Sequence, residues 1–252
     1  LKKKFILFKY KLVERFKYLK NIVIIPTLNE NDNINYLFKL IVNKFKIPIL
    51  FIDDNSSDGT QEKILNLSKK SKLINYIFRK KRYGIGSAHK EGIRWAYKNK
   101  FNLCFTMDAD RTHNPFEINK MITILKKNDA DVIITSRFLK KSSLEDWPFL
   151  RKIITKIRYY LVKIILNTKL DSSGGFRCYN ISKIKKEDIL LAENNGYFFL
   201  IESLFYLERL NYKIFEIHSN LKFRSSGQSK MRLIDILSAL INLFRLSLFN
   251  KI

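Results

Sequence analysis

Residues 47–60 read IPILFIDDNSSDGT, and this stretch holds the pattern that decides the fold. The apolar run that ends at Ile52 predicts a short buried strand. Asp, Asn, Ser and Gly follow at once, and they are typical of a tight turn and of the cap of a helix, here one that begins near Thr60. The stretch therefore predicts a strand, a polar turn and a helix in direct succession.

The same succession recurs through the first half of the chain. Four more apolar runs predict strands over residues 22–25, 74–78, 103–107 and 132–135. Amphipathic stretches between them predict helices over residues 33–45, through Ile93 and Ala96, and from near Pro115. Strands that alternate with helices favour an α/β fold with a mostly parallel central sheet and helices on both of its faces. In such sheets ligands bind beyond the carboxyl ends of the strands.

The second half of the chain has a different order. Its patterns predict helices over residues 149–167, 200–210 and 231–249, a Gly-containing loop that runs from 171 into a short strand near 179, a strand over 213–218 and a polar loop over 224–230. No repeat or linker divides the chain, so we expect one domain over residues 21–230, preceded by a basic extension, residues 1–20, and followed by an amphipathic helix, residues 231–252. We expect no signal peptide and no transmembrane helix, because residues 1–20 lack a small-residue cleavage site and no run reaches about 18 apolar residues.

The composition is strongly basic, with 48 Lys and Arg against 23 Asp and Glu and a formal charge of +25. Such an excess favours an anionic partner: a nucleic acid, a phosphorylated substrate or an acidic membrane. A codon bias toward Lys, Ile and Asn is the alternative explanation for the bulk of the charge. Cys104 and Cys178 belong to no CxxC motif or Cys/His pair, so we expect neither a disulfide framework nor a zinc site, which fits a reducing cytoplasm.

Polar residues follow three of the predicted strands: PTLNE at 26–30, the turn at 53–60, and DAD at 108–110. Two carboxylates one residue apart can share Mg²⁺ or Mn²⁺, whose other ligands come from a diphosphate and water. Such a cation offsets the charge that grows on a diphosphate leaving group. The turn at 53–60 also fits a plain helix cap, and that alternative stays open.

Two further sequence features argue against other chemistries. The GIG at residues 84–86 lacks the third Gly of a dinucleotide fingerprint and does not follow the first strand, so NAD binding is rejected. The three histidines, His89, His113 and His218, are scattered along the chain, so no catalytic or metal role is predicted for them.

Seven segments in order resemble family 2 glycosyltransferases, in particular the dolichyl-phosphate mannosyltransferase (polyprenyl-phosphate glycosyltransferase) branch. They are residues 26–30, 53–60, 84–86, 107–110, 136–138, 173–179 and 227–230. SGGFRCY at 173–179 is similar to the family's SGFR segment, and FRSSGQSK at 223–230 to its FxxRxxGxSK loop, shifted by one residue at the start. The resemblance runs from about residue 21 to the carboxyl end and implies a GT-A fold.

The resemblance also implies which residues bind the sugar donor. They are Pro26, Leu28, Glu30, Ile52, Asp54, Asp108, Ala109, Asp110, Arg137, Arg224 and Lys230. Among them, Ile52 and Asp54 are expected at the base and ribose, and Asp108 and Asp110 at Mg²⁺ or Mn²⁺. Leu28 departs from the Tyr that is usual at its position, which is expected to loosen stacking on the base.

Three arginines, Arg137, Arg151 and Arg224, resemble those that gather the acceptor phosphate and the donor diphosphate, and Lys230 resembles the loop lysine that closes over the donor. With Asp110, these arginines are the implied catalytic residues. A phosphate monoester has a second pKa of about 6 and is mostly dianionic near neutral pH, so it needs no general base to attack. Arginine suits such an acceptor because its fork binds phosphate bidentately and stays charged. Attack in one displacement implies inversion at the sugar.

The implied reaction is transfer of a sugar, in first place mannose from GDP-mannose, to dolichyl or another polyprenyl phosphate. The alternative is glucose or a modified sugar from a UDP-sugar, moved to a bacterial polyprenyl phosphate. Nucleic-acid binding is a remote alternative, because no helix-turn-helix, zinc or RNA-binding signature is present.

The acceptor's tail lies in a bilayer, so we expect a peripheral protein on the cytoplasmic face of a membrane. The amphipathic helices over 149–167 and 231–249 are the expected contacts with the membrane surface, unless they face the core or another subunit. The resemblance also allows a small membrane-protein partner.

Overall fold

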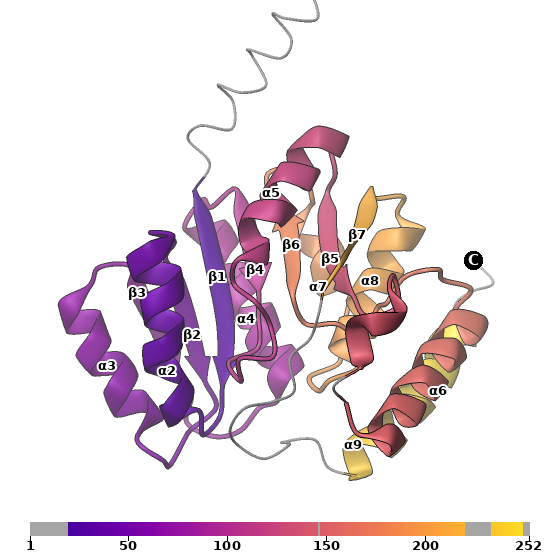
Figure 1. The fold of residues 1–252 in the computed structure, drawn as a ribbon, viewed down its shortest axis with the longest axis horizontal. Helices are drawn as coiled ribbons and strands as arrows, with labels where there is room; N and C mark the ends of the chain where they lie inside the picture. Colours follow the sequence, from indigo (N-terminus) through magenta and orange to yellow (C-terminus); the bar gives the residue numbers. More distant parts are fainter. Residues whose placement is uncertain (1–19, 146, 220–232, 249–252) are drawn as a thin grey trace, which may run out of the picture.

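The computed structural model describes residues 20–145, 147–219 and 233–248. Within these ranges the chain builds a seven-stranded sheet in the order β3-β2-β1-β4-β6-β5-β7 (Figure 1). The strands are β1 Asn21–Thr27, β2 Ile49–Asp53, β3 Ile74–Phe78, β4 Leu103–Thr106, β5 Val132–Ser136, β6 Arg177–Asn180 and β7 Ile214–His218. The predicted mostly parallel sheet is therefore confirmed.

One strand runs against the others. β6 pairs antiparallel with both β4 and β5, with Arg177 opposite Thr106 on one side and Ile134 on the other. The remaining pairs, β1 with β2 and β4, β2 with β3, and β5 with β7, are parallel. Because β6 is reversed, its first residue lies at the edge where the parallel strands end. The loop that precedes β6 is thereby brought to the ligand-binding edge of the sheet.

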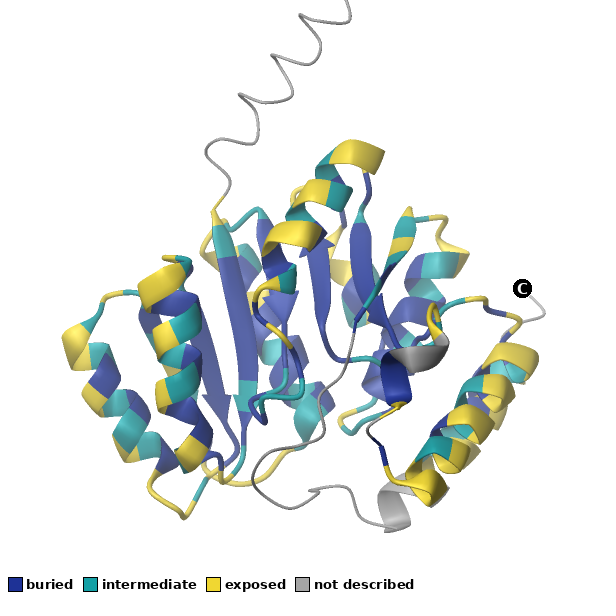
Figure 2. Cartoon of the chain, viewed as in Figure 1, coloured by how far each residue is buried: buried dark blue, intermediate teal, exposed yellow. Residues whose placement is uncertain are grey.

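Helices cover both faces of the sheet. They are α2 Asn31–Leu37, which continues into the π-helical η1 Phe38–Lys44, α3 Thr60–Lys70, α4 Ile85–Lys98, α5 Glu117–Asn128, the 3₁₀ turn η2 Lys141–Leu144, α6 Phe149–Ile165, α7 Lys186–Leu190, α8 Phe199–Arg209 and α9 Leu233–Leu248. Alternate residues of β1 supply the two cores: Val23 packs with residues of α2, α3 and α5, whereas Ile24 packs with residues of α4, α7 and α8. Figure 2 shows the central strands buried between these layers, whereas the edge strands β3 and β7 are only partly buried.

A third, smaller core joins the two helices that the sequence marks as amphipathic. Val162 of α6 and Leu243 and Leu246 of α9 pack with Phe198 and Phe205 around α8. Figure 1 shows α6 and α9 side by side at one end of the molecule. None of the helices in the described ranges is long and apolar enough to cross a membrane.

Candidate functional site

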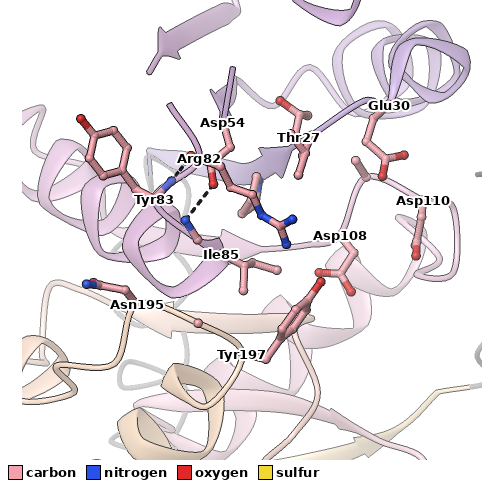
Figure 3. A pocket seen from close by; sticks show the side chains of 15 residues that line it. Thr27, Glu30, Asp54, Arg82, Tyr83, Ile85, Asp108, Asp110, Asn195 and Tyr197 are labelled. Carbon is pink, nitrogen blue, oxygen red and sulfur yellow. Dashed lines mark hydrogen bonds between the residues drawn. The ribbon is translucent and has the colours of Figure 1, made fainter. Parts of the chain in front are cut away.

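A pocket of about 470 Å³ opens at the carboxyl edge of β1, β2 and β4 (Figure 3). Its wall comes from the ends of these three strands and from the loops that precede α4 and α8. The lining residues are Pro26, Thr27, Leu28, Glu30, Asp54, Arg82, Tyr83, Gly84, Ile85, Asp108, Ala109, Asp110, Asn195, Gly196 and Tyr197. A cavity of this size lies in the range of small-ligand sites, about 300–1,000 Å³.

Seven of the residues expected to bind the donor line this pocket: Pro26, Leu28, Glu30, Asp54, Asp108, Ala109 and Asp110. Ile52 does not. Its side chain is fully buried in the core on the α4 side of the sheet, where its Cδ1 atom lies against Gly92. The alternation along β2 turns the Ile52 side chain into the core, so a contact of Ile52 with the base would have to come from its backbone.

The two adjacent carboxylates at the end of β2, Asp53 and Asp54, have different partners. Asp53 accepts hydrogen bonds from Thr27 Oγ1 (2.7 Å), the backbone N–H of Ser56 (2.8 Å) and Gln61 Nε2 (2.6 Å), so it holds the turn and the start of α3. Asp54 lines the pocket instead, where it accepts the backbone N–H groups of Tyr83 (3.2 Å) and Gly84 (3.0 Å) and pairs with Arg79. The helix-cap interpretation thus describes Asp53, and the pocket interpretation describes the position of Asp54.

The carboxylates after β4 are held by their own loop. The backbone N–H and Oγ1 of Thr112 both donate to Asp110 Oδ1, at 3.1 and 2.6 Å. The backbone N–H of Asp108 donates to His113 Nδ1 (3.1 Å), and the His113 ring stacks on Phe176 at 5.3 Å. These contacts hold the Asp110 carboxylate and the Asp108 backbone at the pocket edge.

The site supplies only part of a metal coordination shell. No group of three or more His, Cys, Asp or Glu side chains suited to a metal occurs in the part of the chain that the structure describes. Asp108 and Asp110 present carboxylate oxygens, which Mg²⁺ and Mn²⁺ prefer. The donor set fits a cation that takes its remaining ligands from a diphosphate and water.

Arg137 follows β5 and is buried beside the loop that leads into β6. Its Nε and Nη2 atoms donate to the two carboxylate oxygens of Asp171 at 2.9 and 2.7 Å, and Nη2 also donates to Ser173. Burial alone would lower the pKa of Arg137, but Asp171 and then Asp108 raise it above its usual value. Burial would likewise raise the pKa of Asp171, but Arg137 holds it below its usual value. The guanidinium is therefore charged and fixed by Asp171, and the Asp108 carboxylate also favours its charge, although Arg137 does not itself line the pocket.

Of the other expected cationic residues, the structure describes Arg151 alone. Arg151, in the first turn of the exposed helix α6, stacks its guanidinium 4.3 Å from the ring centre of Trp147 and does not line the pocket. Arg224 and Lys230 lie outside the described residues.

The sequence patterns missed several pocket residues: Arg82, Tyr83, Asn195 and Tyr197. In Figure 3 the side chain of Arg82 extends into the pocket from the loop before α4, and Tyr197 lies beside Asp108 from the loop before α8. Gly86 is the sequence signal for this arrangement, beyond its place in the segment 84–86 of the family resemblance. A Cβ atom at Gly86 would meet the carbonyl oxygens of residues 194 and 196 at 2.6 Å, so only Gly lets the two loops close on each other.

Comparison with known proteins agrees with this geometry. Residues 22–187 match the family "Glycosyl transferase family 2". The chain is 34% identical over 237 residues to the dolichol-phosphate mannosyltransferase of Pyrococcus furiosus, covering 90% of this chain and 64% of that protein. It is 27% identical over 229 residues to the undecaprenyl-phosphate mannosyltransferase of Micrococcus luteus, covering 90% of this chain and 93% of that protein.

Among solved structures, the chain resembles the glucosyl-3-phosphoglycerate synthase of Mycobacterium tuberculosis in complex with Mn²⁺, UDP-glucose and phosphoglyceric acid. The TM-score is 0.63 with 16% identity, over 95% of this chain and 81% of that one. At this identity the likeness concerns the fold, which is GT-A. The fold, the pocket at the strand ends and the family match over most of the chain lead to one conclusion: this protein is a glycosyltransferase that belongs to glycosyl transferase family 2.

Proposed function

We propose that this glycosyltransferase transfers mannose from GDP-mannose to a polyprenyl phosphate of the dolichol type, with inversion at the sugar. The observation that carries the proposal is the approach of two groups of opposite charge. The carboxylates of Asp108 and Asp110 line the pocket, and the charge of Asp108 favours the charged form of the buried Arg137 guanidinium. Relatives named as polyprenyl-phosphate mannosyltransferases support this choice of sugar and acceptor.

The donor would lie with its nucleotide along Pro26, Leu28, Glu30 and Asp54. Its diphosphate would reach Asp108 and Asp110, which would hold Mg²⁺ or Mn²⁺, and the cation would supply positive charge to the leaving diphosphate. Arg224 and Lys230 would add phosphate contacts to this site, in keeping with the family resemblance.

The acceptor phosphate would enter beside Arg137 and Arg151. Because it is already mostly dianionic near neutral pH, it attacks the anomeric carbon without a general base. An oxygen of the acceptor bonds to the anomeric carbon as the bond between that carbon and the donor diphosphate breaks, on opposite sides of the carbon. Arg137, held by Asp171, would orient the incoming phosphate, so catalysis rests on positioning and electrostatics.

The helices α6 and α9 would place the enzyme on the cytoplasmic face of a membrane. Large apolar side chains of α6 that are strongly exposed include Phe149 (75%), Leu150 (72%), Ile154 (62%) and Ile164 (75%). Ile241, Phe244 and Leu248 of α9 are exposed as well. Because Lys152, Lys156 and Lys163 accompany them on α6, anionic lipids would add about 1 kcal/mol for each nearby basic residue.

Radiolabelled transfer into organic-extractable lipid tests the proposal. GDP-mannose, UDP-glucose and other nucleotide sugars are offered in turn with dolichyl and undecaprenyl phosphate. We expect the label to enter lipid from GDP-mannose and to require Mg²⁺ or Mn²⁺. If label enters lipid only from a UDP-sugar, the donor is that UDP-sugar and not GDP-mannose. If the protein binds nucleic acid but transfers no sugar, the proposal is wrong.

A further inference from the structure

The inner face of α6 carries a second arginine that the family resemblance does not assign. Positions 151, 155, 158 and 162 are spaced by three or four residues and share one face of the helix. Thr155 and Val162 on this face are buried, whereas Ile154, Ile157, Leu161 and Ile164 on the opposite side are exposed. Arg151 and Arg158 therefore lie two turns apart on the face of α6 that is turned toward the protein.

A ring contact brings this part of α6 to the strand end that carries Arg137. The ring of Tyr159, which follows Arg158, stacks on the ring of Phe138, which follows Arg137, with a centroid distance of 3.9 Å. α6 therefore packs directly on the segment after β5. Arg137 and Arg158 each directly precede one of the two stacked residues, Phe138 and Tyr159.

Arg158 is half-buried, and its partners differ from those of the buried arginines Arg137 and Arg177. Arg137 is paired with Asp171, and Arg177 donates to Gly174, Tyr179, Ser203, Ser172 and Leu200. For Arg158 the described part of the chain provides no hydrogen bond or ion pair, although its Nε atom is buried. Removing Nε of a charged guanidinium from water without a hydrogen-bond partner is costly, which favours an external ligand for Arg158.

The electrostatic surroundings of Arg158 indicate the sign of that ligand. Burial, together with the positive charges of Arg137 and Arg151, lowers its pKa to about 10, and Asp171 offsets this only in part. Two positive charges and only one negative charge thus act on the Arg158 guanidinium. Such a cluster is short of negative charge, and a phosphate monoester with a charge near −2 would supply it.

We propose that Arg158 is a further acceptor-binding residue, which binds a phosphate monoester together with Arg137 and Arg151. This inference rests on the proposed function for the identity of the acceptor, a polyprenyl phosphate. In the absence of the acceptor, no residue in the described ranges hydrogen-bonds to or ion-pairs with the Arg158 guanidinium. Binding of the phosphate satisfies its donors and draws the monoester between α6 and the end of β5.

Calorimetric binding of a short, water-soluble isoprenyl phosphate, without donor, tests the assignment. Arg158→Lys keeps the charge but loses the fork, so we expect its Kd to rise about tenfold or more over wild type. Arg94→Lys, an identical change at an exposed position of α4, should leave the Kd unchanged. Equal Kd values for Arg158→Lys and wild type overturn the proposal, as does a wild type that does not bind the probe.

Two further binding experiments distinguish a phosphate monoester from the phosphodiester headgroups of the bilayer. Inorganic phosphate should compete with the isoprenyl phosphate in wild type and compete less in Arg158→Lys. Binding to phosphatidylglycerol vesicles, which carry phosphodiesters only, should be the same in both proteins. If Arg158→Lys weakens vesicle binding and leaves the isoprenyl phosphate unchanged, the residue serves the bilayer surface and the proposal is wrong.

A second variant guards against a purely structural role. Arg158→Met removes an unpaired charge, so its Tm should equal or exceed that of wild type while binding of the isoprenyl phosphate falls. A lower Tm together with unchanged binding would mean that Arg158 stabilises the fold and does not bind the acceptor. If wild type binds the probe in an Arg158-dependent manner but transfers no sugar to it, the proposed function fails and this inference stands.

Discussion

The pair of Arg137 and Asp171 gives the sharpest quantitative prediction, through the substitution Asp171→Asn. Both side chains are buried, with 8% and 1% exposed, and two hydrogen bonds of 2.9 and 2.7 Å join them. The backbone N–H of Arg137 adds a third bond to Asp171 Oδ2, of 3.1 Å. Asparagine fills the same space but leaves the Arg137 charge without its counter-charge.

The expected loss follows from the burial of both partners. Removal of one member of a buried ion pair costs about 3–5 kcal/mol, because the remaining charge stays buried and unpaired. For a protein of this size 1 kcal/mol shifts Tm by about 2–4 °C, so we expect Tm to fall by roughly 6–20 °C. Asp129→Asn is the matched control, since its pair with Lys183 is exposed and such pairs contribute about 0–1 kcal/mol.

Urea denaturation measures the free energy of unfolding of both variants, and thermal denaturation measures their Tm. Both are followed by circular dichroism. The sign of the pH dependence follows from the lowered pKa of Asp171. A group with a depressed folded-state pKa stabilises the protein fully above its unfolded pKa, about 3.9, and this contribution is lost as the pH falls through the folded pKa. The gap between wild type and Asp171→Asn should therefore be constant from about pH 5 to 8 and close below about pH 4. The reasoning is refuted if Asp171→Asn loses no more stability than Asp129→Asn does. It is also refuted if the stability difference between wild type and Asp171→Asn stays the same below about pH 4.

Three further predictions concern the metal, the acceptor and the membrane. Chelator should abolish transfer and Mg²⁺ or Mn²⁺ restore it, while Asp110→Ala stays folded and inactive; transfer in excess chelator would contradict this. Arg151→Ala should bind GDP-mannose almost as wild type does but transfer far less, measured by calorimetry and lipid extraction; equal transfer rates would exclude its role. Ile154→Glu with Ile164→Glu should weaken sedimentation with anionic vesicles at least about tenfold, since apolar burial drives interfacial binding, and unchanged sedimentation would count against the membrane surface.

The first half of the fold could be predicted because each unit is local. The run that ends at Ile52 and the turn up to Thr60 predict β2 and the start of α3, and the structure confirms both. The reversal of β6 could not be predicted, because a strand of four residues carries no sign of its partners. Its direction depends on pairing with β4 and β5, which lie about 40 to 80 residues earlier in the chain.

The site was predictable where its residues follow a strand directly. Asp108 and Asp110 come to the pocket because parallel strands end at one edge, and Asp54 follows the same rule. The positions of Arg82 and Tyr197 in the pocket could not be predicted, because their two loops are far apart in the sequence and meet only in the folded structure. The side-chain direction of Ile52 could not be predicted from the resemblance, because it depends on the register of β2 against the helices, which turns it into the core.

The identity of the released nucleotide, measured together with the mass of the lipid product, tests the central claim most directly. Attack of the acceptor phosphate on the anomeric carbon leaves the whole diphosphate on the nucleotide. We predict one GDP released for each mannose transferred, and a lipid product that contains a single phosphorus in a β-linked mannosyl phosphate. Release of GMP with a diphosphate-linked sugar, or release of GDP with free mannose as the only product, would contradict the account.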